Sequence, residues 1–256
     1  MSELQGDLGK YLSGMPVTVA GANVAISQPS IKDICAFGED SFLMSVELFV
    51  KAKELAAEMK NVGKSQLGYM DDFQILLVII QQDENTKRNV DNLFGLIFPD
   101  YIVEYDAGCI NFRVQESGPI VGQLNPMNFE NFRITLKELF LPVGTDKYEE
   151  EFNPANDAAA EIAAKLQRGR EIRNQIKSEK DKKKANSIFG NYASALSIGL
   201  AIDINVIYNY TPFQLFDSIK RYTLKMAYDL YQKVATTPMM DVSKMDEPDN
   251  WMDGIY

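Results

Sequence analysis

The amino-acid sequence predicts an α+β fold, with a mixed N-terminal part and a helical C-terminal part. Three short alternating runs, at 101–105, 109–115 and 120–124, are separated by the turn residues DAG and ESGP and indicate an antiparallel meander. The stretch TPFQ at 211–214 indicates a helix start, because it offers a threonine cap, a proline at the first helical position and a glutamine in the capping-box position. With 256 residues, of which 46% are hydrophobic, the chain can bury a core.

The first elements predicted along the chain are a hairpin and two helices. Two alternating runs around AGAN predict a hairpin over 17–26. A short helix is expected over 30–37, ended by Gly38, and a second helix from about 40 to 60, where apolar residues recur near helical spacing. We expect these two helices to pack beside the hairpin.

Two further helices are predicted before the meander and one after it. Periodicity alone does not separate a buried strand from a buried helix in YMDDFQILLVIIQQ, but Asp71 is a good helix cap. The next stretch keeps helical spacing until Pro99, so we predict a helix for both segments. The helix expected over 128–140 has one aromatic and apolar face, formed by Phe129, Phe132, Leu136 and Phe140.

Composition divides the chain into four predicted regions. Residues 1–145 are the α+β domain, and 146–186 are an acidic linker followed by a long charged helix. Residues 187–240 are a helical domain, and 241–256 are an acidic tail that ends in an aromatic motif. The stretch 161–184 carries nine basic and four acidic residues, whereas the whole chain has a net charge of −10.

The residue types argue against an enzyme, a cofactor or a metal. The chain has no histidine, and so it lacks the usual general base and the commonest metal ligand. Cys35 and Cys109 lack CxxC spacing and are interpreted as small core residues. The VGKS at 62–65 lacks the first glycine of a phosphate-binding loop, and Asp71 is better explained as a helix cap than as a metal ligand. A nuclease built on carboxylates and lysine stays open if distant carboxylates converge in a cleft.

Charge and hydropathy bear on partners and location. The negative net charge disfavours nucleic acid, and the basic stretch 161–184 has no aromatic residue to stack on a base, so a solvated helix or contact with an acidic protein is favoured. The strongest apolar run, at 75–80, is far shorter than the roughly 20 residues of a membrane span. The N-terminus has no secretory signal pattern, so we expect no membrane contact and a cytoplasmic protein.

The helix that starts at Thr211 is predicted to pack against other protein, because its aromatic residues spread beyond a single face. Tyrosine suits burial between helices or subunits, and an aromatic motif after an acidic linker suits docking into a groove. The tail could equally fold back onto its own domain, and both alternatives stay open. The residues expected to contact a partner are Phe213, Phe216, Tyr222, Tyr228, Trp251, Met252, Ile255 and Tyr256.

Five stretches resemble tail-gene-cluster proteins of bacteriophages that infect Gram-positive bacteria. They are ISQPSIKDICAFGEDSF, MDDFQILLVIIQQDE, FPDYIVEYDAGCINFRV, IVGQLNPMNFENFRITLKELF and TPFQLFDSIKRYTLKMAYDL. The group most similar in character is that of tail assembly chaperone-like proteins, which are encoded beside the tape-measure protein.

This resemblance implies a non-enzymatic protein of virion morphogenesis that binds tape-measure or tail-tube proteins in the host cytoplasm. The resemblance transfers no functional residue. The alternative is a structural component of the phage tail or baseplate, which would be found in the virion. A homo-oligomer is compatible with either role.

Overall fold

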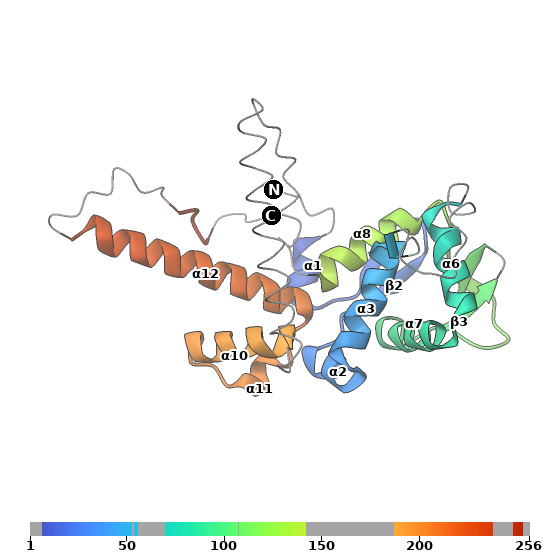
Figure 1. The fold of residues 1–256 in the computed structure, drawn as a ribbon, viewed down its shortest axis with the longest axis horizontal. Coiled ribbons are helices and arrows are strands. Elements are labelled where there is room, and N and C mark those ends of the chain that lie inside the picture. The colour runs from blue at the N-terminus through green and yellow to red at the C-terminus, as the bar shows by residue number, and fades with distance from the viewer. Residues whose placement is uncertain are drawn as a thin grey trace, which may run out of the picture.

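The computed structural model describes residues 7–52, 54–55, 70–106, 108–141, 187–237 and 248–252. These residues form an α+β fold with nine helices, a two-stranded hairpin and a three-stranded antiparallel sheet (Figure 1). The predicted fold class is therefore confirmed. The predicted charged helix and the VGKS stretch lie outside the described residues, as do Ile255 and Tyr256.

A short helix, α1 (Leu8–Ser13), begins the described chain and was not predicted. The side chain of Asp7 accepts hydrogen bonds from the backbone N–H groups of Gly9 and Lys10, and Gly14 ends the helix in the left-handed conformation at φ 70°. Six residues are too few to show helical periodicity, so the sequence pattern gives little signal there.

The predicted hairpin and the first two predicted helices are present. Strands β1 (Val17–Val19) and β2 (Val24–Ile26) pair antiparallel. Helix α2 (Ile31–Phe37) starts at a capping box formed by Ser30 and Asp33.

Helix α3 (Glu39–Val50) begins directly after Gly38 and is interrupted at Lys51, after which Ala52, Glu54 and Leu55 are helical again. It stops because Lys51 leaves the helical conformation, with φ −126° and ψ 34°. Residues 56–60, the last part of the predicted helix, lie outside the described residues.

The apolar run is a helix, as predicted. Helix α6 (Asp72–Gln82) starts at Asp71, whose side chain forms a capping box with Gln74. Helix α7 (Glu84–Ile97) follows at once, capped by Asp83. Most of the run faces the core, since its buried residues are Phe73, Ile75, Leu76, Leu77, Ile79 and Ile80.

The predicted meander is confirmed as one sheet with the strand order β3-β4-β5. Its strands are β3 (Ile102–Asp106), β4 (Cys109–Arg113) and β5 (Ile120–Leu124), and each pair is antiparallel. Helix α8 (Phe129–Phe140) comes next, and all four residues of its predicted apolar face are buried.

Three helices make up the C-terminal part. They are α10 (Ile188–Leu200), the single turn α11 (Ile204–Ile207) and α12 (Pro212–Ala235). The predicted start of α12 is confirmed, because Thr211 and Gln214 form a capping box and proline occupies the first turn.

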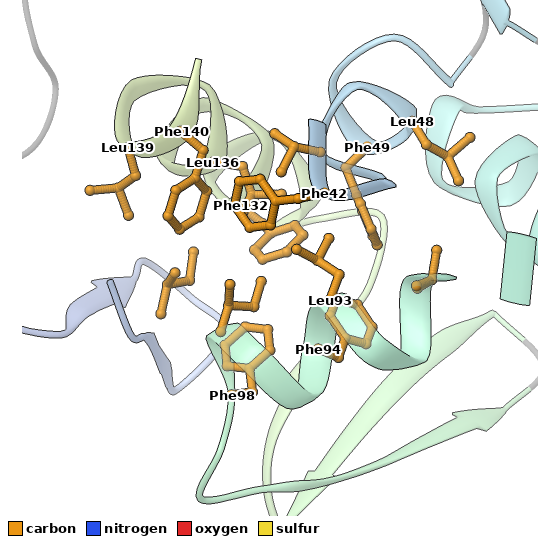
Figure 2. Close-up of a cluster of buried hydrophobic side chains, with 14 of the residues drawn as sticks. Phe42, Leu48, Phe49, Leu93, Phe94, Phe98, Phe132, Leu136, Leu139 and Phe140 are labelled. Atoms are coloured by element: carbon orange, nitrogen blue, oxygen red, sulfur yellow. The ribbon is translucent and has the colours of Figure 1, made fainter. Parts of the chain in front are cut away.

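Phenylalanine side chains from α3, α7 and α8 meet in the centre of the N-terminal part (Figure 2). Phe132 packs edge-on against Phe49 at 5.4 Å between ring centroids, and Phe140 packs in the same way against Phe42 at 5.4 Å. Strand β4 joins them through Phe112, and buried residues of α10 and α12 belong to the same cluster. The two parts therefore share one hydrophobic core.

The interpretation of the two cysteines as core residues is wrong. Cys35 is exposed and Cys109 is partly exposed, and both are free thiols. On α2 the core-facing positions are taken by Ile31 and Ile34, both 0% exposed. Cys35, the next residue around the helix, therefore points to solvent.

The tip of the hairpin lies directly on strand β5 at Gly122. The backbone N–H of Gln123 donates to the carbonyl of Ala22 at 2.9 Å, and the side-chain amide of Asn128 donates to the carbonyl of Gly21 at 2.9 Å. A Cβ atom on Gly122 would stand 2.4 Å from Cγ1 of Val24 and 2.6 Å from the oxygen of Ala22. The hairpin can approach the sheet this closely only because residue 122 has no side chain.

We predict that Gly122→Ala lowers the free energy of unfolding by about 1 to 3 kcal/mol, because the added methyl forces the hairpin away from the sheet. The matched control is Gly95→Ala on the exposed side of α7, where an added Cβ meets no atom within 4 Å. That change should raise stability by about 0.5 to 1 kcal/mol through the better helix propensity of alanine. Urea unfolding of both variants measures the difference, and equal effects would contradict this packing.

Candidate interaction surface

The C-terminal helices are attached through the N-terminus of α10. The carboxylate of Glu39, the first residue of α3, accepts hydrogen bonds from the hydroxyl of Ser187 and from the backbone N–H groups of Ile188 and Phe189, the last at 3.2 Å. The first N–H groups of a helix lack partners within the helix, and a carboxylate also interacts well with the helix dipole there. No local pattern links Glu39 to a helix about 150 residues later in the chain, so sequence reasoning missed this contact.

A reciprocal contact attaches α2 to the segment before α12. The backbone N–H of Ile31 donates to the carbonyl of Tyr210 at 2.9 Å, and that of Lys32 donates to the carbonyl of Tyr208 at 2.9 Å. The free N–H groups of α2 are thus satisfied by the C-terminal part. These bonds fix the point from which α12 starts.

The first turn of α12 is buried in the core. Phe213 is 2% exposed and packs edge-on against Tyr11 of α1, at 5.1 Å between ring centroids. The side-chain amide of Gln214 donates to the carbonyl of Leu12 at 2.7 Å. Phe213, one of the residues expected to contact a partner, therefore contacts its own chain and is not on an accessible surface.

The next two turns of α12 pack along α10. Phe216 is partly buried and lies 5.8 Å from the ring of Phe189 and 5.9 Å from that of Tyr192. Further along, Tyr222 lies on Gly199, where an added Cβ would stand 2.4 Å from the phenol oxygen. The earlier residue of α12, Phe216, contacts the first half of α10, and the later one, Tyr222, contacts its last turn. The two helices therefore run in the same direction.

Helix α12 continues beyond the end of α10. The latter ends at Leu200, next to Tyr222, whereas α12 reaches Ala235. Residues 223–235, here called the free half of α12, add about 20 Å of helix. Figure 1 shows this half extending beyond α10, with the short red segment of residues 248–252 beside it.

An apolar stripe runs along the side of α12 that faces α10. At helical spacing, Phe216, Ile219 and Tyr222 are followed on the same side by Met226 and Leu230. The first three are partly buried, whereas Met226 is 55% and Leu230 is 59% exposed. The stripe therefore begins under α10 and continues uncovered on the free half.

The neighbouring end of α10 adds apolar surface beside this stripe. Ile198 is 81% exposed and Leu200 is 43% exposed. Exposed apolar side chains on neighbouring helices are typical of protein contact sites when they gather on one surface.

The tail residues 248–252 lie beside α12, on another side of the helix. The Nη1 group of Arg221 donates a hydrogen bond to the backbone carbonyl of Trp251 at 2.9 Å. Trp251 is partly buried and Met252 is 67% exposed. Of the two alternatives for Trp251, the structure shows the one in which the segment folds back onto its own chain.

Tyr228, the remaining described residue of the predicted set, is partly buried on the Arg221 side of α12. Sequence reasoning did not single out Arg221, because a lone arginine on a charged helix carries no signal of its long-range partner. The predicted residues are thus distributed between the core, the α10 contact and the tail contact.

Asp71, which was considered as a metal ligand, caps α6, and the neighbouring Asp72 forms an ion pair. A shallow pocket is lined by Glu54 and Asp72 together with Lys51, Arg133 and the aliphatic atoms of Val50 and Ala52. There Arg133 pairs with Asp72 at 3.1 Å and with Glu130 at 2.6 Å. Among the described residues, no three potential metal ligands gather in one place. The nuclease alternative therefore gains no support from this pocket.

The shifted pKa values have structural causes. Burial and a 2.6 Å hydrogen bond to Glu138 raise the pKa of Tyr11, and burial with a 2.6 Å bond to Asp91 does the same for Tyr105. Although Cys35 is exposed, partial desolvation by its neighbours and the nearby Glu39 carboxylate raise the pKa of its thiol, which makes it less reactive.

The chain was compared with protein-family models, with curated proteins and with solved structures, and none of them matches. Within the part of the chain that the structure describes, no helix combines the length and the apolarity that a membrane crossing requires. The surface on α12 is therefore interpreted from its own geometry.

We predict that Phe213→Ala lowers the free energy of unfolding by about 3 to 5 kcal/mol, since it empties a fully buried site. Met226→Ala should change it by no more than about 0.5 kcal/mol, because that side chain stands mainly in solvent. Thermal and urea unfolding of the two variants measure the contrast. Similar losses in both would show that the free half of α12 is packed in solution.

Proposed function

We propose that the protein is a non-enzymatic binding protein, and that the free half of α12 is where it contacts its partner. The observation that supports this proposal is the continuation of the α10-facing stripe as the exposed pair Met226 and Leu230. A side chain pair four residues apart on one helix face is the usual anchor for a second helix.

The geometry favours a helical partner. In the first half of α12, this stripe is covered by α10, which runs in the same direction and ends at Leu200. A partner helix that continues in line with α10 would meet the same stripe at Met226 and Leu230. The intramolecular packing of α10 thus serves as a template for the proposed contact.

The resemblance to tail-gene-cluster proteins suggests which partner to test. We propose a tail assembly chaperone-like role in phage virion morphogenesis, in which the helical partner is the tape-measure protein or a tail-tube subunit in the host cytoplasm. The second candidate, a structural tail or baseplate component, has the same resemblance behind it. The two differ in whether the protein remains in the finished virion.

We predict that the double variant Met226→Gln and Leu230→Gln weakens binding to the partner by at least about tenfold, since two apolar anchors are lost. Glutamine keeps helix propensity, so the melting temperature should not change. The matched control is Met44→Gln on α3, which replaces a methionine that is 68% exposed elsewhere. Titration of each variant with the purified tape-measure and tail-tube proteins measures the affinity.

Mass spectrometry of purified particles separates the two roles. A chaperone leaves before the tail is complete, whereas a structural component is present at fixed stoichiometry. The proposal fails if neither tail protein binds the wild-type chain, or if the double variant binds as well as the control. Size-exclusion chromatography of the protein alone reports whether the stripe instead pairs with a second copy.

A further inference from the structure

The side of α12 that carries Arg221 differs from the α10-facing stripe and has an occupant in the structure. Leu224 and Tyr228 follow Arg221 at three and seven residues, so all three lie on one side of the helix. All three are partly buried, although they lie at or beyond the end of α10. The opposite side carries Met226 and Leu230, which are exposed.

Arg221 is held in place by a buried carboxylate. Its Nε group lies 3.2 Å and 3.1 Å from the two carboxylate oxygens of Asp217, one turn earlier, and Asp217 is 5% exposed. A guanidinium is planar and rigid, so this contact also orients its remaining N–H groups. The Nη1 group that donates to the carbonyl of Trp251 is therefore positioned by α12 itself.

The charges of the two segments are complementary. Residues 241–256 contain five acidic residues and one lysine, whereas α12 contains four basic and two acidic residues. Their attraction adds a long-range component to the single hydrogen bond, and salt screens it.

We infer that the side of α12 formed by Arg221, Leu224 and Tyr228 is a docking site for the chain's own residues 248–252. These residues lie at Arg221 in the same molecule, and the side with Met226 and Leu230 is left to a partner. The inference does not depend on the proposed function. It adds to that function the side of α12 from which a partner approaches.

The fluorescence of Trp251 measures the docking directly, because Trp251 is the only tryptophan of the chain. We predict that Arg221→Gln lowers the docking equilibrium constant about tenfold, since a hydrogen bond from a charged donor is lost. In the full-length protein, the Trp251 emission should then move to longer wavelength and acrylamide should quench it more strongly. High salt should increase the quenching of the wild-type protein in the same direction.

The matched control is Lys225→Gln, which removes the same charge one turn later, where the lysine pairs with Asp229 at 2.6 Å. Quenching should increase much less in this variant than in Arg221→Gln, because Lys225 contributes only long-range attraction and no hydrogen bond to Trp251. If Arg221→Gln unfolds because the buried Asp217 loses its ion pair with Arg221, the double variant Asp217→Asn and Arg221→Gln removes both charges. Circular dichroism shows which of them is folded.

Each outcome decides the inference. If acrylamide quenches Trp251 in folded Arg221→Gln no more than in the wild type, the inference is overturned. It is also overturned if Lys225→Gln increases the quenching as much as Arg221→Gln does. If the quenching of Trp251 depends on the protein concentration, the segment docks on a second copy of the protein, and docking within one chain is overturned. In the partner titration, Arg221→Gln should bind like the wild type, and a loss equal to that of the Met226 and Leu230 variant overturns the separation of the two sides.

If no tail protein binds any variant, the proposed function fails, and the fluorescence result still decides whether the segment docks.

Discussion

The architecture depends on helix N-termini that are completed by groups from the other half of the chain. Glu39 accepts hydrogen bonds from the first N–H groups of α10, and the carbonyls of Tyr208 and Tyr210 accept those of Ile31 and Lys32 at the start of α2. Such N–H groups are costly to bury without a partner, so each half removes a penalty that the other would otherwise carry. The shared core, with Phe213 packed against Tyr11, makes the junction apolar as well as hydrogen-bonded.

This junction determines what α12 can do. Because its first turn is fixed in the core and its next turns are covered by α10, the helix is held at one end only. The free half then presents two different sides. One is an exposed apolar continuation of an internal packing stripe, and the other is charged and carries the chain's own tail at Arg221. A single helix thereby combines anchoring, a candidate partner contact and an intramolecular contact.

Most of the secondary structure could be predicted because its signals are short in sequence. The capping boxes at Ser30, Asp71 and Thr211 each involve residues three positions apart, and they mark the starts of α2, α6 and α12 as observed. The strands were recognisable from alternation and turn residues. The helix α1 was missed because it is shorter than the window that periodicity needs, and the break at Lys51 was missed because helical spacing continues past it.

The sequence alone determined the α+β class, the order of the elements from the hairpin to α8 and the presence of a long aromatic helix near the C-terminus, since all of these follow from patterns within a few residues. Only the tertiary structure decided which side of each element is covered. It buried Phe213, exposed Cys35, placed Tyr222 on Gly199 and brought Arg221 to Trp251. The physical reason is that burial and capping depend on neighbours from distant segments. Glu39 and Phe189, 150 residues apart, meet only when the whole chain is folded.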